Sequence, residues 1–268
     1  MRTALILVKR YVFAFVCCIY LFAFGWLRGR HRALLAAICS HFGLETRTVE
    51  QTLPEVPIED LLRNPLPVRI PEPTPQDGNV SPLESLVIAG LTAACAPASC
   101  FEIGTFDGRT ALTLAANCAD GARVYTLDLP ADQLDTAALA LEHADRAYVD
   151  KPVVGVRLLG RPEAARVTQL LGDSASFDFT PYHGRMDLVF VDGAHHYDYV
   201  MSDSRQALKM LPADRGIILW HDYGGWPGVT RALNQLQATD PEFRGVRHIA
   251  GTSLACLIRG PIPERAAR

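Results

Sequence analysis

The chain has 268 residues, of which 49% are hydrophobic, and this content excludes an intrinsically disordered protein and allows a sizeable core. The formal net charge is -3 and the 26 basic residues are scattered, so nothing in the charge suggests nucleic acid as a partner. Seven cysteines, without a C-x-x-C pair and mostly within apolar runs, favour a reducing compartment.

The N-terminal 30 residues form the first predicted region. Residues 11–27 contain no charged side chain and are flanked on both sides by basic residues, which predicts a single transmembrane helix near the short end of the range that spans a bilayer. A signal peptide and a segment that the cell does not use are the alternatives. The basic residues on both sides leave the orientation open.

Residues 31–78 form the second predicted region, which joins the first to the body of the protein. Apolar residues at helical spacing over 32–42 predict a juxtamembrane helix. Seven prolines between residues 53 and 75 exclude long helices and central strands. This stretch is therefore interpreted as an extended linker with a short helical turn near residues 58–63.

The third region, residues 79–262, is predicted to be an α/β domain. Its first residues, Ser81-Pro82-Leu83-Glu84, are a capping box with proline at the first helical position, and they predict a helix. Apolar runs and helical patterns then alternate, which indicates a mostly parallel sheet with helices on both faces. The runs 188–191 and 217–220 are continuously apolar, as central strands buried on both faces are.

The remaining elements are predicted in chain order. The first core strand is the short apolar run that begins at Cys100 and ends in an acid, and further strands are expected at 123–127, 166–170, 186–191 and 216–220. Helical segments are expected at 110–117, 131–147, 197–210 and 229–237. The last two strands, 246–249 and 254–258, are predicted to form an antiparallel hairpin.

A glycine turn leaves the first core strand. Glu102 and Gly104 lie at the end of this strand, and Gly108 precedes the next helix. Asp128 ends the second strand, at a distance where an acid can bind the hydroxyls of a ribose. The spacing differs from G-x-G-x-x-G, so no pyrophosphate cradle is indicated. A tight turn that binds no ligand is the alternative.

The pattern E-x-G-x-x-x-G formed by these residues resembles the first motif of the class I S-adenosylmethionine-dependent methyltransferases, and the resemblance extends over about residues 79–258. It implies a Rossmann-like, doubly wound, mostly parallel sheet that ends in a reversed strand, with S-adenosylmethionine as the cofactor. It also implies that the glycine turn lies under the methionine part of the cofactor and that Asp128 binds the ribose. Because S-adenosylmethionine is a cytosolic metabolite, a membrane-anchored protein would hold this domain in the cytoplasm.

Ligands bind open parallel sheets at the carboxyl ends of the strands, so residues that follow the later strands complete the predicted site. Gly172-Asp173-Ser174 resembles the adenine-binding motif of small-molecule O-methyltransferases, and an ordinary helix N-cap is the alternative. The cofactor-binding residues are therefore expected to be Glu102, Gly104, Gly108, Asp128 and Asp173.

The segment from Asp192 to Tyr197 places an acid directly after a buried strand, followed by two histidines and an aromatic residue. It resembles the V-D-G-x-H-x-Y segment of a methyltransferase branch that includes metal-dependent sugar and macrolide O-methyltransferases. The resemblance implies that Asp192 is a metal ligand and that His195 is a candidate base for a substrate hydroxyl. These two residues are the expected catalytic pair, and His196 is interpreted as a helix-start or supporting residue.

His221 and Asp222 follow the next strand, where metal-dependent relatives usually carry two acids or an Asp-Asn pair. The histidine departs from that pattern. Asp192, His221 and Asp222 are the candidate ligands of Mg²⁺ or Mn²⁺, and a helix cap or a substrate contact is the alternative role of Asp222. Metal binding stays open.

These motifs predict an S-adenosylmethionine-dependent methyltransferase that acts on a hydroxyl of a small molecule or glycan. Two other classes stay open. One is a metal-dependent oxidase or hydrolase that uses Asp192, His195, His221 and Asp222, and the other is a membrane-tethered binding domain without catalytic activity. The expected partners are the acceptor and the membrane, with a cytoplasmic protein as the alternative, and the oligomeric state is left open.

Overall fold

The computed structural model describes residues 2–29, 31–32, 34–35, 38, 49–76, 78–142 and 144–261. The chain divides into two compact units, residues 1–48 and residues 49–268. The body of the protein thus begins at Val49, earlier than the boundary at residue 79 that the sequence suggests.

Helix α1 (Arg2–Phe24) and a short 3-10 helix (Gly25–Leu27) are the main elements of the first unit. Residues 6–27 are long and apolar enough to cross a membrane, although a signal sequence would pass the same test. At the usual rise per residue this stretch is roughly 33 Å long, about the thickness of the hydrocarbon core. The predicted juxtamembrane helix at 32–42 lies largely outside the described residues.

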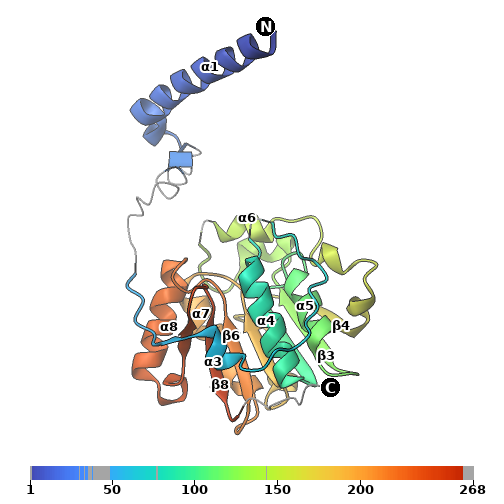
Figure 1. The fold of residues 1–268 in the computed structure, drawn as a ribbon. Helices are drawn as coiled ribbons and strands as arrows, with labels where there is room; N and C mark the ends of the chain where they lie inside the picture. Colours follow the sequence, from blue (N-terminus) through green and yellow to red (C-terminus); the bar gives the residue numbers. More distant parts are fainter. Residues whose placement is uncertain are drawn as a thin grey trace. The chain divides into compact units, whose positions relative to one another are not determined.

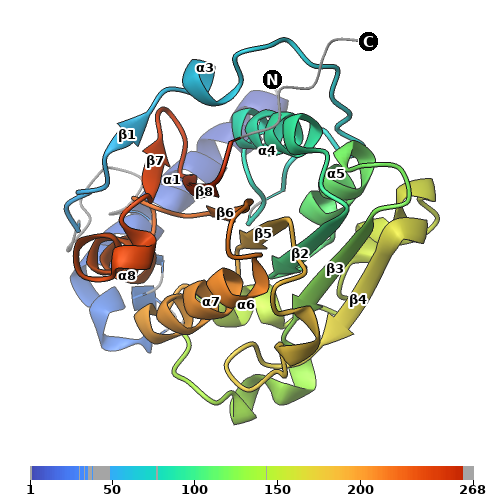
Figure 2. The same ribbon diagram turned by 90° about the horizontal axis from the view of Figure 1, so that it is seen from below.

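The second unit is an eight-stranded sheet with the order β1-β7-β8-β6-β5-β2-β3-β4 (Figures 1 and 2). Every pairing is parallel except those of β8, which is antiparallel to both β6 and β7. The strands are β1 (Glu55–Val56), β2 (Ser99–Ile103), β3 (Arg123–Asp128), β4 (Val167–Leu171), β5 (Leu188–Val191), β6 (Gly216–Trp220), β7 (Arg247–Ile249) and β8 (Ala255–Arg259). The predicted doubly wound sheet and the terminal antiparallel hairpin are both confirmed.

Helices cover both faces of this sheet. Figure 2 shows α4 and α5 on one side and α7 and α8 on the other. The helices of this unit are α3 (Ile58–Leu61), α4 (Pro82–Cys95), α5 (Arg109–Asn117), α6 (Asp145–Val149), α7 (Tyr197–Met210) and α8 (Pro227–Thr239).

The side chains of the central strands alternate between two hydrophobic clusters because successive residues of a strand point to opposite faces. Phe101, Val189 and Ile218 belong to the cluster that also contains residues of α7 and α8. Cys100 and Phe190 belong to the cluster formed with α4 and α5. All four residues of β5 are buried, which explains why this strand is apolar throughout.

The predicted capping box at the start of α4 is present. The Ser81 hydroxyl accepts the backbone N–H of Glu84, and the Glu84 carboxylate accepts the backbone N–H of Ser81 at 2.7 Å. Pro82 follows at the first helical position, where its fixed φ suits a helix. The capping box and this proline together define where the helix begins.

The predicted helix at 131–147 is wrong. A 3-10 helix (Ala131–Thr136) and the short α6 replace it. The backbone N–H of Ala138 donates to the Asp173 carboxylate at 2.6 Å, and Asp173 lies in the loop that follows β4. In a continuous helix this N–H would instead donate to a carbonyl of the same segment. This contact joins Ala138 to the loop that follows β4.

The proline-rich segment is extended, as predicted, and it is fixed to the second unit. Strand β1 pairs with β7 at one edge of the sheet, and the short α3 occupies the predicted helical turn. Further along, the buried Arg109 side chain donates to the carbonyl oxygens of Glu72, Pro73 and Val80. We refer to residues 49–76 as the strap.

Candidate active site

The carboxyl ends of β2, β3, β4, β5 and β6 meet around one cavity of about 290 Å³. Seven residues singled out from the sequence line it, namely Gly104, Asp128, Asp173, Asp192, His195, His221 and Asp222. Helix α6, which includes Tyr148, also lines the cavity, as does Lys151 just after it. Gly78 and Asn79 line it from the chain that follows the strap. The fold therefore brings most of the predicted site together.

Gly104 has a positive φ of 102°, and a Cβ atom at this position would overlap the carbonyl oxygen of Asp192. A glycine is thus required where the backbones leaving β2 and β5 cross closely. Gly108 also has a positive φ, 92°, and precedes α5, but its surroundings are Gly155 and Leu158. It does not line the cavity.

Glu102 does not line the cavity either. Its side chain is fully buried, and one carboxylate oxygen accepts the hydroxyl of Thr126, which itself lies 2.6 Å from the Thr105 hydroxyl. Burial raises the pKa of Glu102 well above its ordinary value. These contacts indicate that Glu102 is neutral and supports the glycine turn from beneath. They do not indicate a direct contact between Glu102 and a ligand.

Asp128 and Asp173 face the cavity from β3 and from the loop after β4. Asp128 accepts the backbone N–H of Phe106 at 2.8 Å and forms an ion pair with Lys151 at 2.9 Å. Asp173 accepts the hydroxyl of Tyr199 at 2.9 Å in addition to the Ala138 N–H. No α-helix begins at Asp173, so the helix N-cap alternative does not hold there.

His195 lies between two carboxylates. Its Nδ1 forms a short hydrogen bond with Asp145, and its Nε2 lies 2.8 Å from Asp222. The ring is stacked on Trp226 with 4.0 Å between the ring centroids. Burial lowers the pKa of His195, but the hydrogen bonds with Asp145 and Asp222 outweigh it and raise the pKa to about 9.

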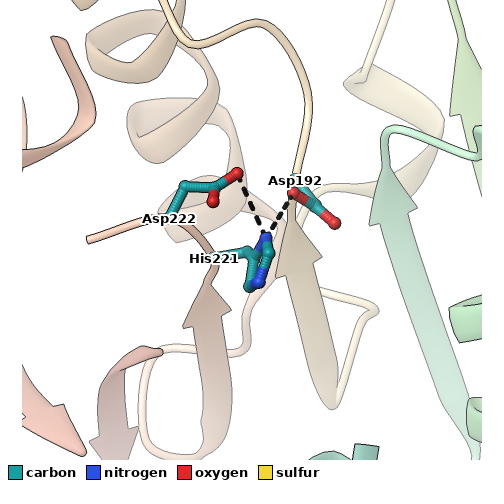
Figure 3. A group of neighbouring side chains, drawn as sticks. All are labelled: Asp192, His221 and Asp222. Carbon is teal, nitrogen blue, oxygen red and sulfur yellow. Dashed lines mark hydrogen bonds and ion pairs between the residues drawn. The ribbon is translucent and has the colours of Figure 1, made fainter. Parts of the chain in front are cut away.

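His221 lies in a second, adjoining group of acids (Figure 3). Its Nδ1 is 3.1 Å from both Asp192 and Asp222, and its Nε2 is 3.4 Å from Glu84. Burial opposes the charge, yet Asp192 and the other two acids together raise the pKa of His221 far above its ordinary value. Two imidazoles are thus embedded among four carboxylates along one wall of the cavity.

Asp222 links these two groups because its carboxylate contacts both histidines. Its backbone has a positive φ of 66°, which is unusual for a residue other than glycine and costs on the order of 1 kcal/mol. The conformation turns the chain after β6 so that successive side chains, His221 and Asp222, both reach the cavity.

The donor atoms of Asp192, His221 and Asp222 lie within 4.8 Å of one another, so a divalent cation is sterically compatible with them. A set of two carboxylates and one imidazole suits Mn²⁺ better than Mg²⁺, which prefers oxygen ligands. The imidazole must lose its proton before it can bind a metal.

Three functional candidates were not found from the sequence. Asp145 and Lys151 lie in and just after the segment predicted as one continuous helix, and nothing in a helical pattern signals that either side chain faces a cavity. Glu84 was recognised as a capping residue, but its second contacts, with His221 and Ser253, depend on the folded chain. The burial of Glu84 is likewise seen only in the folded chain, so the sequence carries no signal for its second role.

Residues 101–223 match the family model described as a methyltransferase domain. Among solved structures, the chain is similar to the O-methyltransferase TomG from Streptomyces achromogenes, crystallised with S-adenosylmethionine (20% identity, TM-score 0.49, 69% of this chain and 83% of that chain). It is also similar to the S-adenosylhomocysteine-bound methyltransferase PaMTH1 from Podospora anserina (21%, 0.45, 69% and 81%) and to an O-methyltransferase from Bacillus cereus (17%, 0.46, 69% and 84%). No curated protein matches the chain.

The protein has a doubly wound sheet with one reversed strand and a ligand-sized cavity at the carboxyl ends of its parallel strands, which is the place where open α/β sheets bind ligands. The match of residues 101–223 to a methyltransferase domain agrees with the resemblance of the first motif to the class I S-adenosylmethionine-dependent methyltransferases.

Proposed function

We propose that the protein transfers the methyl group of S-adenosylmethionine to a hydroxyl of a small molecule or glycan. The observation that carries this proposal is His195, a potential proton acceptor held between Asp145 and Asp222 in the wall of the cavity. Oxygen acceptors need such a group because a hydroxyl is a weak nucleophile until its proton is removed.

The cofactor is proposed to lie along the ends of β2, β3 and β4. Asp128 would bind the ribose hydroxyls, Asp173 with Ser174 would face the adenine, and the turn at Gly104 would lie beside the methionine part. The carboxylates at these strand ends are hydrogen-bond acceptors of the kind that a ribose diol and an amine require. Glu102 and Gly108 would support this turn without touching the cofactor.

The sulfonium of the cofactor already carries the activation for an in-line methyl transfer, so the protein mainly aligns the acceptor and removes its proton. His195 is the proposed base, and Asp192 is proposed to help hold the acceptor. Because the pKa of His195 is raised to about 9, the ring is mostly protonated near neutral pH and must first lose a proton to act as the base. Once deprotonated it is a strong proton acceptor, so the proposed mechanism gives a rate of methyl transfer that rises with pH up to about 9.

A divalent metal is proposed as an optional second cofactor, held by Asp192, His221 and Asp222. It would act as a Lewis acid that stabilises the acceptor oxygen as the proton leaves. Metal analysis of the purified full chain tests this point. Stoichiometric Mn²⁺ that is lost in D192N would support the site, and metal-free protein with full activity would refute it.

Helix α1 is proposed to anchor the protein in a membrane, with the methyltransferase unit in the cytoplasm, where S-adenosylmethionine is made. In this proposal the membrane is the partner of the first unit, and the methyl acceptor is the partner of the second unit.

The test of the proposed function is formation of S-adenosylhomocysteine by the full chain when it is incubated with S-adenosylmethionine and fractionated small-molecule and glycan extracts. We expect a methylated hydroxyl in one fraction, and loss of that product in H195N but not in H183N, whose histidine lies outside the cavity. Cofactor binding without any product would favour a silent binding domain. Tight metal without cofactor binding would favour the oxidase or hydrolase.

A further inference from the structure

Lys151 carries a positive charge into the cavity beside Asp128. Its ammonium group lies 2.9 Å from Asp128 Oδ2, and the two side chains are only 12% and 10% exposed. The same ammonium donates to the carbonyl oxygen of Tyr148 at 2.7 Å and lies 5.7 Å from the centre of the Phe106 ring. These contacts hold it in one place.

The Asp128 carboxylate accepts the backbone N–H groups of Phe106 and Leu129 in addition to its ion pair with Lys151. Oδ2 accepts from both the Phe106 N–H, at 2.8 Å, and Lys151. Two donors on one oxygen fix the rotation of the carboxylate, so Oδ1 keeps a constant direction relative to the end of β3. A charge-assisted pair of this kind is about twice as strong as a neutral hydrogen bond.

Lys151 also affects the charge of this carboxylate. Burial raises the pKa of Asp128, and the Lys151 ammonium opposes that rise. The buried Glu102 also interacts electrostatically with Asp128, and it supplies no positive charge. Lys151 is therefore the cation that favours the ionised form of Asp128.

We propose that Lys151 is a positioning residue of the cofactor site, which holds the Asp128 carboxylate in one rotation so that its second oxygen meets the ribose hydroxyls of S-adenosylmethionine. Lys151 acts through Asp128 and not by contacting the reacting atoms. This inference rests on the proposed role of Asp128 in the cofactor site.

The experiment is calorimetric titration of the full chain, in detergent, with S-adenosylhomocysteine and with its 2′-deoxyribose counterpart. K151M removes the charge but keeps most of the side-chain length, and we expect it to weaken S-adenosylhomocysteine binding about tenfold. K151R keeps the charge and should restore most of the affinity. The 2′-deoxyribose compound, which lacks one of the hydroxyls, should lose much less affinity in K151M than S-adenosylhomocysteine does.

The double variant D128N/K151M separates a positioning role from a merely structural one. If Lys151 acts through Asp128, K151M adds little further loss once Asp128 is already replaced. Additive losses, or equal losses for both compounds, would overturn the inference while leaving the cofactor assignment intact. Unchanged binding in D128N alone would instead overturn the assignment of Asp128, and the inference with it.

Discussion

His195 illustrates how single residues of the cavity depend on neighbours that are distant in sequence. Asp145 is fifty positions away, yet it bonds both the ring and the backbone N–H of His195. Because this carboxylate helps to raise the pKa of His195 to about 9, it also sets how readily the proposed base gives up its own proton.

Replacement of Asp145 by asparagine should lower the pKa of His195 by about one unit or more, since one of two stabilising carboxylates loses its charge. An NMR titration of the His195 ring in wild type and D145N measures this shift. The exposed Asp135, which pairs with Arg146, provides the control variant D135N, and there we expect no change. An unaltered titration in D145N would show that Asp222 alone sets the pKa.

Asp203 on α7 is a second residue whose environment is unusual. It is fully buried, and neither carboxylate oxygen has a hydrogen-bond partner among the described residues. Burial raises the pKa of Asp203 to about 7, and Asp173 adds to the rise. Ser174 opposes part of it, although its hydroxyl does not reach hydrogen-bond geometry.

A pKa of about 7 in the folded protein, above the value of about 3.8 expected when unfolded, means that folding favours the protonated form. The stability of the wild type should therefore fall as the pH rises from 5 to 8, by about 3 kcal/mol relative to D203N, whose side chain does not titrate. Denaturant unfolding of both proteins at the two pH values checks this difference. A constant difference across the range would contradict it.

At the scale of elements, the strap is the main feature that the sequence alone did not reveal. Asn117 on α5 accepts the backbone N–H of Arg69 at 2.8 Å and donates to the carbonyl of the same residue at 2.6 Å. Asn234 on α8 binds the other end in the same way, through Thr52 and Glu50. The side chains of these two asparagines satisfy backbone N–H and C=O groups of the strap that would otherwise be paired in a sheet or helix, which the many prolines of this segment disfavour.

Replacing Asn117 by alanine should free the strap around Arg69 and increase its tryptic cleavage at least about tenfold, because local opening then lacks two hydrogen bonds. Time-resolved trypsin digestion with mass spectrometry identifies the cleaved bond. N234A is the matched control, since it should loosen residues 49–53 without changing cleavage after Arg69. Equal rates at Arg69 in all three proteins would mean that other contacts hold this part of the strap.

The elements that could be predicted are those whose pattern is local. Helix α7 has the predicted bounds because its buried residues recur at helical spacing, and strand β6 has them because it is a continuous apolar run buried on both faces. The prediction for segment 131–147 failed where the backbone N–H of Ala138 bonds to Asp173 and not within a helix. The strap was predicted to be a linker because residues that bind it lie on α5 and α8. Long-range bonds of this kind leave no periodic signal.

At the scale of the whole molecule, the two units are expected to behave independently. A chain that starts at Val49 should fold, remain in the soluble fraction and bind S-adenosylhomocysteine with a dissociation constant within about twofold of the full chain, since every strand of the sheet is retained. The full chain should stay with the membrane fraction after carbonate extraction. Centrifugal fractionation and calorimetry measure both outcomes, and a soluble full chain would contradict the anchor.

The site was predictable from the sequence to the extent that it lies at strand ends. Asp128, Asp173, Asp192 and Asp222 each follow an apolar run, so the topology of a parallel sheet brings them together. The residues that bind these acids, such as Lys151 and Tyr199, come from other segments and need three-dimensional packing to be found.

The close passage of the Asp192 carbonyl beside Gly104 has a consequence for judging distant relatives. Any side chain at position 104 would collide with the main chain of the neighbouring strand, whether or not a ligand is ever bound. A descendant that had given up methylation would still need this glycine in order to fold. Its presence in a sequence therefore says little about activity, whereas the loss of Asp128 or His195 would remove a proposed cofactor contact or the proposed base without touching this backbone crossing.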